Sequence, residues 1–263
     1  MTITHQPDPA TALWVSAHPT RDSFTGRLMQ AGIDELSREY TVTTSDLYAQ
    51  GFDPRLSERD LGAVPEGYRG VVDRMGDASA AGLVPEDVRQ EQAKLAAASL
   101  VILQFPLWWY GPPAMLKGWF DRVLTNGFAY GDDDPTTGIP RRYGDAPLAG
   151  RRALVIVTAG EDDRSIGSRG ISGDIDSLLF PITHGTLWYT GIEALELHVV
   201  HDADGLDIDG MAQETERLTS RLRHLDAESP QAFRRLSDGE YRGTRALRED
   251  ILPGRTDLGI HTH

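Results

Sequence analysis

Short apolar runs alternate along the chain with longer segments in which apolar residues recur every three or four positions. Most of the runs are continuous, as in strands that are buried on both faces of a parallel sheet. They predict five strands, at residues 12–16, 40–46, 100–105, 152–158 and 194–200. The helical periodicity predicts helices between and after them, at residues 24–40, 85–95, 116–124, 175–189 and 210–225. This alternation predicts an α/β protein with a doubly wound, five-stranded parallel sheet flanked by helices.

The segments outside this pattern suggest three parts. Residues 1–10 are polar and broken by proline, and we expect a disordered lead-in there. Residues 11–226 would form the α/β domain, with one long connection at residues 49–85 that includes a short helix near 57–61; such long connections are often functional. Residues 227–263 are charged and rich in arginine, and we expect a C-terminal extension that either packs on a partner subunit or frays.

Composition narrows the class of protein. The 263 residues are 40% hydrophobic and 25% charged, as in a globular protein with an ample core. The net charge of −14 argues against a nucleic-acid partner, which needs a positive face. The chain has no cysteine, so disulfides and Cys-based zinc sites are excluded. Its N-terminus is too polar for a signal peptide, and no apolar run approaches the roughly 20 residues of a membrane span, so we predict a soluble cytoplasmic protein.

The aromatic segment after the third predicted strand is the most informative. Pro106 breaks the apolar run, and Trp108, Trp109 and Tyr110 follow it directly, before Gly111 and two prolines. Three adjacent residues cannot share one face of a helix or strand, which argues against a place in the core. A contact between subunits is an alternative, since tryptophan is common at interfaces. Ligands bind at the carboxyl ends of strands in such sheets, and we therefore hypothesise that this loop holds a flat isoalloxazine ring.

Two further loops follow predicted strands and would meet the aromatic loop at the same edge of the sheet. The first, residues 17–25, precedes a helix whose N-terminus, with Ser23 and Thr25, could bind phosphate. A helix cap at Ser23 and an ordinary turn histidine at His18 are the simpler interpretations. The other, residues 159–173, begins with glycine and could direct backbone amides at ligand carbonyls, although glycine-rich loops are common.

Several familiar motifs are missing or weak. The chain has neither GxGxxG nor a P-loop, and it has no GxSxG nucleophile elbow, so a Rossmann cofactor site, a P-loop NTPase and a serine hydrolase are disfavoured. The acidic residues 132–134 could bind a metal, but a solvated loop is the better interpretation. The terminal histidines His261 and His263 are expected to be inert. We predict no metal site.

Three motifs in order resemble one known family. They are AHPTRDSFT, DLYAQGFDPRLSERD and FPLWWYGPPAMLKGWFDRV, and Gln90-Glu91-Gln92 precedes the third motif while GFAYG follows it. This arrangement, covering about residues 13–197, resembles the NAD(P)H:quinone oxidoreductase (DT-diaphorase) family of flavodoxin-like flavoproteins.

The resemblance implies a homodimer with one FAD per subunit, or FMN as an alternative, and sites at the subunit interface. NAD(P)H would deliver hydride to the flavin and leave before a quinone or a similar flat acceptor enters, in a ping-pong reaction. The implied cofactor contacts are His18, Phe24, Thr25, Pro106, Leu107, Trp108, Trp109, Tyr110, Thr158, Ala159, Gly160 and Glu161. The implied catalytic residues are Trp109, Tyr130, Ser172 and, across the dimer, Tyr189.

The chain also departs from the family pattern. Ile166 and Ser172 stand where mammalian members have a tyrosine and a histidine that steady the reduced flavin, and Met211 falls near an arginine that reaches the FAD pyrophosphate. Thr25 replaces an asparagine. Two alternatives therefore stay open: a reductase of azo, nitro or diazo compounds in a biosynthetic pathway, and a flavin-binding regulatory protein that has lost catalysis. A one-electron carrier is disfavoured by the long aromatic loop, because carriers expose the edge of the flavin and need no pocket for a nicotinamide.

Overall fold

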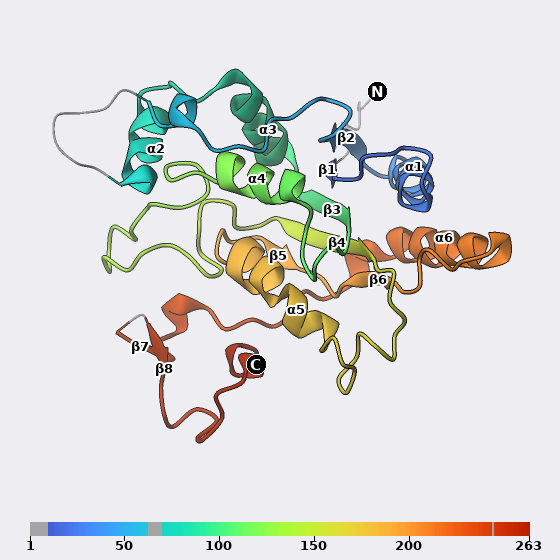
Figure 1. The fold of residues 1–263 in the computed structure, drawn as a ribbon. Helices are drawn as coiled ribbons and strands as arrows, with labels where there is room; N and C mark the ends of the chain where they lie inside the picture. Colours follow the sequence, from blue (N-terminus) through green and yellow to red (C-terminus); the bar gives the residue numbers. More distant parts are fainter. Residues whose placement is uncertain (1–9, 63–69, 244) are drawn as a thin grey trace, which may run out of the picture.

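The computed structural model describes residues 10–62, 70–243 and 245–263. One parallel sheet forms its centre, with the strand order β2-β1-β3-β4-β5 and with β6 also paired to β4 (Figure 1). The strands are β1 (Thr11–Ser16), β2 (Thr41–Asp46), β3 (Leu100–Pro106), β4 (Arg152–Thr158), β5 (Glu193–Ala194) and β6 (His198–Val200). This order, in which the second strand lies at the edge beside the first, is that of flavodoxin-like sheets and confirms the predicted fold class.

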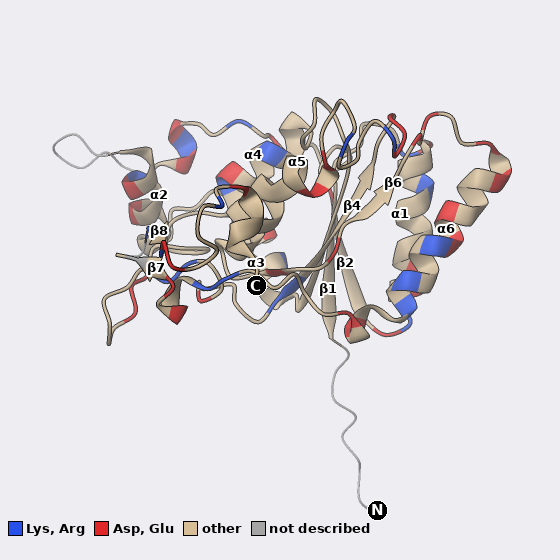
Figure 2. Cartoon of the chain, turned by 90° about the horizontal axis from the view of Figure 1, so that it is seen from below, with Lys and Arg blue, Asp and Glu red and all other residues tan. Residues whose placement is uncertain are grey.

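Helices cover both faces of the sheet. Figure 2 shows α1 and α6 on one face and α3, α4 and α5 on the other. The strands alternate their side chains between two cores: Trp14 and Ile102 pack toward α1 and α6, while Val15 and Leu103 pack toward the opposite helices. Burial on both faces explains the continuous apolar runs. The helices are α1 (Phe24–Leu36), α2 (Val71–Ala80), α3 (Glu86–Ala97), α4 (Ala114–Val123), α5 (Ile175–Ile182) and α6 (Ile208–Arg223).

The predicted fifth strand is interrupted. The sequence pattern indicated one strand at residues 194–200, whereas the structure has β5 and β6 separated by residues 195–197. Arg221 of α6 supplies a reason, because its guanidinium donates to the carbonyls of Glu196 (2.7 Å) and Leu197 (3.1 Å). These carbonyls therefore pair with a side chain at the break.

Two predicted helices end differently from their sequence pattern. The first was expected to reach residue 40 but ends at Leu36, and Ser37 caps it through its own backbone. The helix at residues 175–189 forms as predicted, but only in part as an α-helix: after Pro181 it continues as a π-helix (Thr183–Trp188). Proline removes one backbone donor, so a change of hydrogen-bond pattern next to it is expected. The short helix near residues 57–61 is a 3-10 helix (Glu58–Asp60).

The C-terminal segment, residues 227–263, lies against its own subunit. Phe233 is buried beside His184 and Trp188, with ring centroids 5.1 and 6.1 Å away. The indole of Trp188 donates to the carbonyl of Arg234 (3.0 Å), and Gln231 donates to the carbonyl of Ala194. The expected fraying is therefore not seen, and packing on a partner subunit stays a prediction. The lead-in at residues 1–9 lies outside the described residues.

Candidate functional site

Two adjoining hollows lie at the edge of the sheet where β1, β3, β4 and β6 end. Their volumes are about 320 and 240 Å³, and Leu107, Gly160 and Glu161 line both. We call the two together the site recess. Every residue that the sequence assigned to cofactor binding lines it: His18, Phe24, Thr25, Pro106, Leu107, Trp108, Thr158, Gly160 and Glu161 line the larger hollow, and Trp109, Tyr110 and Ala159 line the smaller.

A chain of buried hydrogen bonds fixes the floor of the recess. The indole of Trp14 donates to the Gln104 side-chain oxygen (2.9 Å), and the Gln104 amide donates to the carbonyl of Thr25 (2.9 Å). The hydroxyls of Thr25 and Thr158 then share a hydrogen bond of 3.0 Å. These contacts join the start of α1 to β1, β3 and β4. Sequence reasoning missed Gln104, although a polar residue inside the apolar run LVILQFP was a signal that it must have buried partners.

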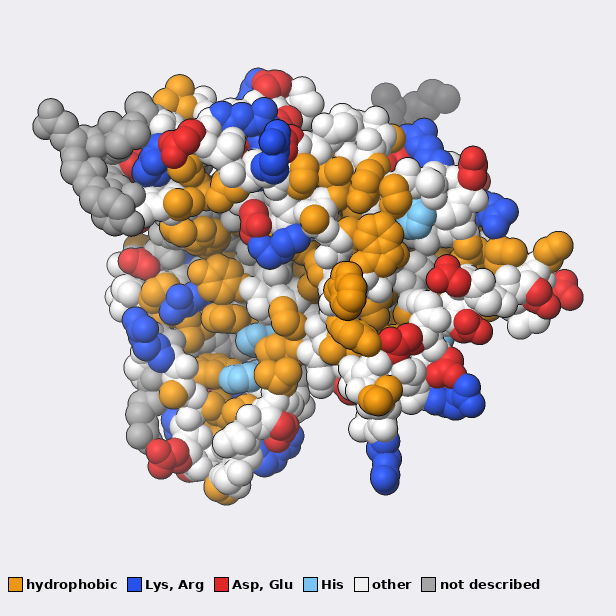
Figure 3. Space-filling view, in the orientation of Figure 1, with side chains coloured by type: hydrophobic (Ala, Val, Ile, Leu, Met, Phe, Trp, Pro, Cys, Tyr) orange, Lys and Arg blue, Asp and Glu red, His pale blue; other side chains and the backbone are white. Residues whose placement is uncertain are grey.

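The aromatic loop is a tight turn that exposes its rings. Trp108 and Gly111 pair as an antiparallel bridge, and the two residues between them, Trp109 and Tyr110, have φ angles of 50° and 59°. Left-handed backbone at two bulky residues is unfavourable by about 1–2 kcal/mol each. Trp109 is 97% exposed, while Trp108 and Tyr110 are 44% and 43% exposed. The structure thus confirms that these rings do not serve the core, and apolar side chains spread across this face in Figure 3.

The loop after β1 forms the helix cap that the sequence allowed. Ser23 accepts a hydrogen bond from the amide of Gly26 (3.1 Å), and the Nδ1 atom of His18 accepts one from the amide of Thr20 (3.2 Å). Phe24 and Thr25, in the first turn of α1, line the larger hollow. Helices leave the amides of their first turn without intrahelical partners. One turn further along, the Arg27 guanidinium contacts the sulfur of Met211 at the start of α6 (3.3 Å).

The loop after β4 presents a carboxylate and two free amides. Glu161 accepts hydrogen bonds from the hydroxyls of Ser172 (2.6 Å), Tyr110 (3.0 Å) and Ser165. These bonds, that of Ser165 first, lower the pKa of the Glu161 carboxyl. Within the described part of the chain, the backbone amides of Gly160 and Glu161 donate to no protein acceptor. Ile166, in place of the family's tyrosine, is buried and lines the smaller hollow.

Tyr130 and Tyr189, two of the predicted catalytic residues, lie apart from the recess. Their ring centroids are 5.7 Å from each other, and Tyr143 completes the group with its ring 5.2 Å from that of Tyr189. Neither Tyr130 nor Tyr189 lines either hollow. The resemblance had implied that the two come from different subunits, whereas the structure has them in contact within one. Burial raises the pKa of the Tyr130 phenol, so it stays protonated and able to donate a hydrogen bond.

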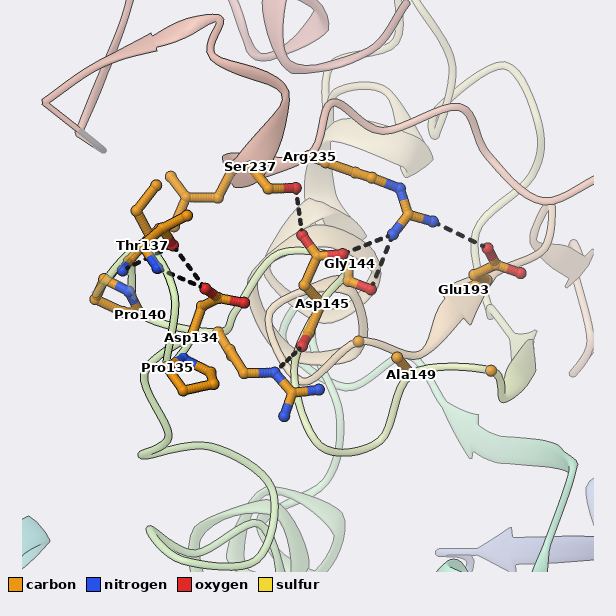
Figure 4. Close-up of a pocket in the computed structure, with 15 residues that line it drawn as sticks. Asp134, Pro135, Thr137, Pro140, Gly144, Asp145, Ala149, Glu193, Arg235 and Ser237 are labelled. Atoms are coloured by element: carbon orange, nitrogen blue, oxygen red, sulfur yellow. Dashed lines mark hydrogen bonds and ion pairs between the residues drawn. The ribbon is translucent and has the colours of Figure 1, made fainter.

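A third hollow, of about 630 Å³, lies between residues 134–150 and the C-terminal segment (Figure 4). We call it the C-terminal recess. Charged side chains that line it pair with other lining residues: Arg235 donates to Asp145 (3.0 Å), and the Ser237 hydroxyl also donates to Asp145 (2.6 Å). Asp134 accepts from the amides of Thr136 and Thr137. None of the predicted site residues lines this hollow.

Two further features bear on the expected class of protein. Across residues 10–62, 70–243 and 245–263, no three or more His, Cys, Asp or Glu side chains gather as a metal site would require. In the same residues, no helix combines the length and the apolar character needed to cross a membrane.

Comparisons with known proteins place this geometry in context. A ribosyldihydronicotinamide dehydrogenase-like protein of Penicillium crustosum is 38% identical over 260 residues, which is 95% of this chain and 94% of that protein. The NAD(P)H dehydrogenase (quinone) 1 of Rattus norvegicus is 36% identical over 226 residues, 84% of this chain and 80% of the relative. The crystal structure of a putative quinone reductase from Klebsiella pneumoniae superposes with a TM-score of 0.91 at 38% identity, covering 97% of this chain and 100% of that one.

These matches extend well past the site. The flavodoxin-like fold family matches residues 10–222, from β1 to the end of α6. The two alignments of 38% identity also cover nearly all of the chain, and therefore most of the C-terminal segment that the sequence motifs did not reach. The chain belongs to the flavodoxin-like fold family, among relatives named as NAD(P)H and ribosyldihydronicotinamide quinone dehydrogenases.

Proposed function

We propose that this protein is a flavin-dependent NAD(P)H oxidoreductase that transfers two electrons to a quinone or a similar flat acceptor. The observation that carries the proposal is the site recess, which gathers three loops at the carboxyl edge of the sheet and exposes flat rings there. The names of the relatives point to the same chemistry. A ping-pong order of substrates is the expected kinetic form, since donor and acceptor would share one stacking surface.

The residues of the recess suit a flavin at three points. The helix N-terminus at Ser23, Phe24 and Thr25 offers amides and a positive dipole end to a phosphate. Trp109 offers an exposed face for stacking, and the free amides of Gly160 and Glu161 offer donors to ring carbonyls. When bound, the flavin supplies hydride acceptance and donation, while the protein positions its partners and excludes water.

FAD is the proposed flavin, with FMN as the alternative. Met211 stands near the position at which some family members have an arginine that reaches the FAD pyrophosphate. Arg27 reaches the same place from α1 and brings a guanidinium to the start of α6. An arginine there can pair with a pyrophosphate. We expect Arg27→Ala to weaken FAD binding about tenfold and FMN binding little, because charge-assisted hydrogen bonds are worth about 1.5–3 kcal/mol. Equilibrium titration of the apoprotein with each flavin measures both affinities; equal losses would remove Arg27 from the pyrophosphate site.

A homodimer is the proposed assembly. Tyr130 and Tyr189 lie together at some distance from their own recess, and an isologous dimer would bring such a pair to a partner's recess. In that arrangement Trp109 stacks on the substrate from one subunit, and the tyrosines close the site from the other. Ser172 contributes through its hydrogen bond to Glu161. Sedimentation of the purified protein tests the assembly. A cytoplasmic location stays a prediction from composition.

Anaerobic spectroscopy tests the proposed reaction. The protein saturated with flavin should lose its visible flavin absorption when NADPH or NADH is added, and regain it when a quinone is added. A flavin that stays oxidised with both nucleotides would contradict the oxidoreductase and favour the regulatory flavin-binding protein. Reoxidation by an azo or nitro compound, but not by a quinone, would favour the related biosynthetic reductase.

A further inference from the structure

Glu161 is unusual among the residues of the site recess. It carries a negative charge, and it is one of three residues that line both hollows. Its carboxylate accepts three hydroxyl hydrogen bonds, from Tyr110, Ser165 and Ser172. In the described part of the chain it makes no ion pair with lysine or arginine, whereas its neighbour Asp162 is paired with Arg164.

This arrangement keeps a charge in place without neutralising it. Hydroxyl donors favour the ionised form of a carboxyl group, which is why the pKa of Glu161 is lowered, but they add no positive charge. The donors come from two separate loops, Tyr110 from the turn after β3 and the two serines from the loop after β4. The Glu161 carboxylate is thereby held at the junction of the two hollows, close in sequence to the free backbone amides of Gly160 and of Glu161 itself.

The other titratable groups around the recess do not offset this charge. His18 comes from the loop after β1, and its Nδ1 atom already accepts from the amide of Thr20. Asp204, from the loop after β6, lines the larger hollow and adds a second carboxylate. Arg164 is engaged by Asp162. Negative charge therefore predominates where the pyrimidine edge of a flavin would lie.

We propose that Glu161 acts on the bound flavin by opposing any added negative charge, so that the reduced flavin takes up a second proton and is harder to reduce. This inference rests on the proposed function. A nearby like charge disfavours an anion and raises its pKa. Hydride from NAD(P)H brings two electrons and one proton to the flavin and leaves NAD(P)⁺; the second proton comes from solvent. The reduced flavin then holds the two electrons and two protons that convert a quinone to a hydroquinone.

The reduction potential of the bound flavin tests this directly. It would be measured by anaerobic titration against a reference dye between pH 6 and pH 8, on the flavin-loaded protein and on Glu161→Gln. For a two-electron couple, a tenfold change in equilibrium constant is about 30 mV. At pH 7 we expect Glu161→Gln to favour reduction about tenfold, which raises the potential by about 30 mV, and this difference should widen as the pH rises. The slope with pH should fall from about 59 to about 30 mV per unit, as the second proton is lost.

The controls separate the possible outcomes. Asp163→Asn makes the same change of charge two residues away at an exposed position, and should leave the potential unchanged. If Glu161→Gln binds flavin with an unchanged potential and slope, this inference is wrong and the proposed function stands. If the unmodified protein binds no flavin, the proposed function itself fails. Should Glu161→Gln not hold flavin, the slope of the unmodified protein decides: about 30 mV per pH unit would overturn the role of Glu161.

Discussion

The site recess and the C-terminal recess are both hollows lined by charged and polar residues, yet they differ in what their walls leave unpaired. The C-terminal recess is the larger, at about 630 Å³ against about 320 and 240 Å³, but Arg235 and Ser237 both donate to Asp145 across it. Among the described residues, the site recess has two backbone amides with no protein acceptor, and it exposes three aromatic side chains. Volume alone would favour the C-terminal recess, whereas the free donors and exposed rings favour the site recess.

The contrast supports the site recess as the proposed binding site and the C-terminal recess as a joint between segments. In the joint, the acidic side chains and Arg235 already have partners, so a charged ligand would have to break existing contacts. In the site recess, exposed aromatic rings gain from being covered, and the donors without protein partners are available to a ligand. The positive φ angles of Trp109 and Tyr110 add to the same argument, because strain of this kind persists where a function maintains it.

The largest effect on stability is expected from a substitution of the buried Trp119, which we compare with the exposed Trp109. Trp119 is almost fully buried in α4 and donates to Glu91 (2.8 Å). Trp119→Ala should lower the free energy of unfolding by about 3–5 kcal/mol, because it leaves a cavity and removes a buried hydrogen bond. Chemical denaturation measures this. A change below about 1 kcal/mol would mean that the helix is packed less tightly than the structure has it.

Trp109→Ala should show the opposite behaviour. Its side chain is 97% exposed, so we expect the free energy of unfolding to change by less than about 0.5 kcal/mol. Turnover with NAD(P)H and a quinone should fall about 100-fold, because misplacing reactants by a small distance has effects of that order. Steady-state kinetics and denaturation are measured on the same preparation. Unchanged turnover would remove the stacking role of this ring.

Acid should loosen the C-terminal side of the molecule. Burial lowers the pKa of His184 to about 4, from an ordinary value near 6.5, where it stacks on Phe180 with ring centroids 4.5 Å apart. Between pH 6.5 and about pH 4, His184 is protonated in the unfolded state but not in the folded state. The free energy of unfolding therefore falls as the pH drops from 6.5 toward 4. The loss is up to about 1.4 kcal/mol per pH unit. His184→Phe should make this dependence shallower in a denaturation series, and the buried His198, whose pKa is lowered to about 3, should supply the rest of it. A variant whose stability falls with acid as steeply as that of the unmodified protein would contradict the assignment.

The strain in the aromatic turn can be measured by comparing two substitutions at one position. Both Trp109→Ala and Trp109→Gly remove the ring, but only glycine adopts a φ of 50° without a steric penalty. The glycine variant should therefore be about 1 kcal/mol more stable than the alanine variant, the reverse of the usual ranking. Denaturation midpoints provide the comparison. If alanine were the more stable, the turn would not hold the left-handed backbone.

The smallest effect is expected in the C-terminal recess. The Arg235 side chain is 39% exposed and pairs with Asp145, so Arg235→Ala should lower the free energy of unfolding by about 1 kcal/mol or less. Turnover should not change. A loss of turnover comparable to that of Trp109→Ala would show that the C-terminal recess takes part in the reaction.

The sequence was sufficient for the fold and for naming the predicted cofactor contacts that line the site recess, because both depend on local patterns. Continuous apolar runs identified the strands, and parallel strands bring their following loops to one edge, which placed Trp109, Thr25 and Gly160 together before any coordinates. The aromatic run was also correctly interpreted as exposed, since three adjacent residues cannot share one buried face.

What escaped prediction depends on contacts between distant residues. The hydrogen bond between Gln104 and Thr25 spans 79 residues, and the pairing of Arg221 with the interrupted fifth strand spans 24 or 25. The tight turn at Trp109 and Tyr110 was equally hidden, because such turns ordinarily favour asparagine and glycine. Local preferences there are overridden by the strands that fix the ends of the loop.

The exposure of the aromatic turn also makes the protein its own optical sensor. Trp14, Trp119 and Trp188 are buried, whereas Trp108 and Trp109 face water at the mouth of the recess. Emission from these two should be open to quenching by a dissolved iodide ion, while that of the other three is shielded. A molecule that settles over the turn would block the quencher, so that occupancy can be followed by fluorescence without labelling the protein.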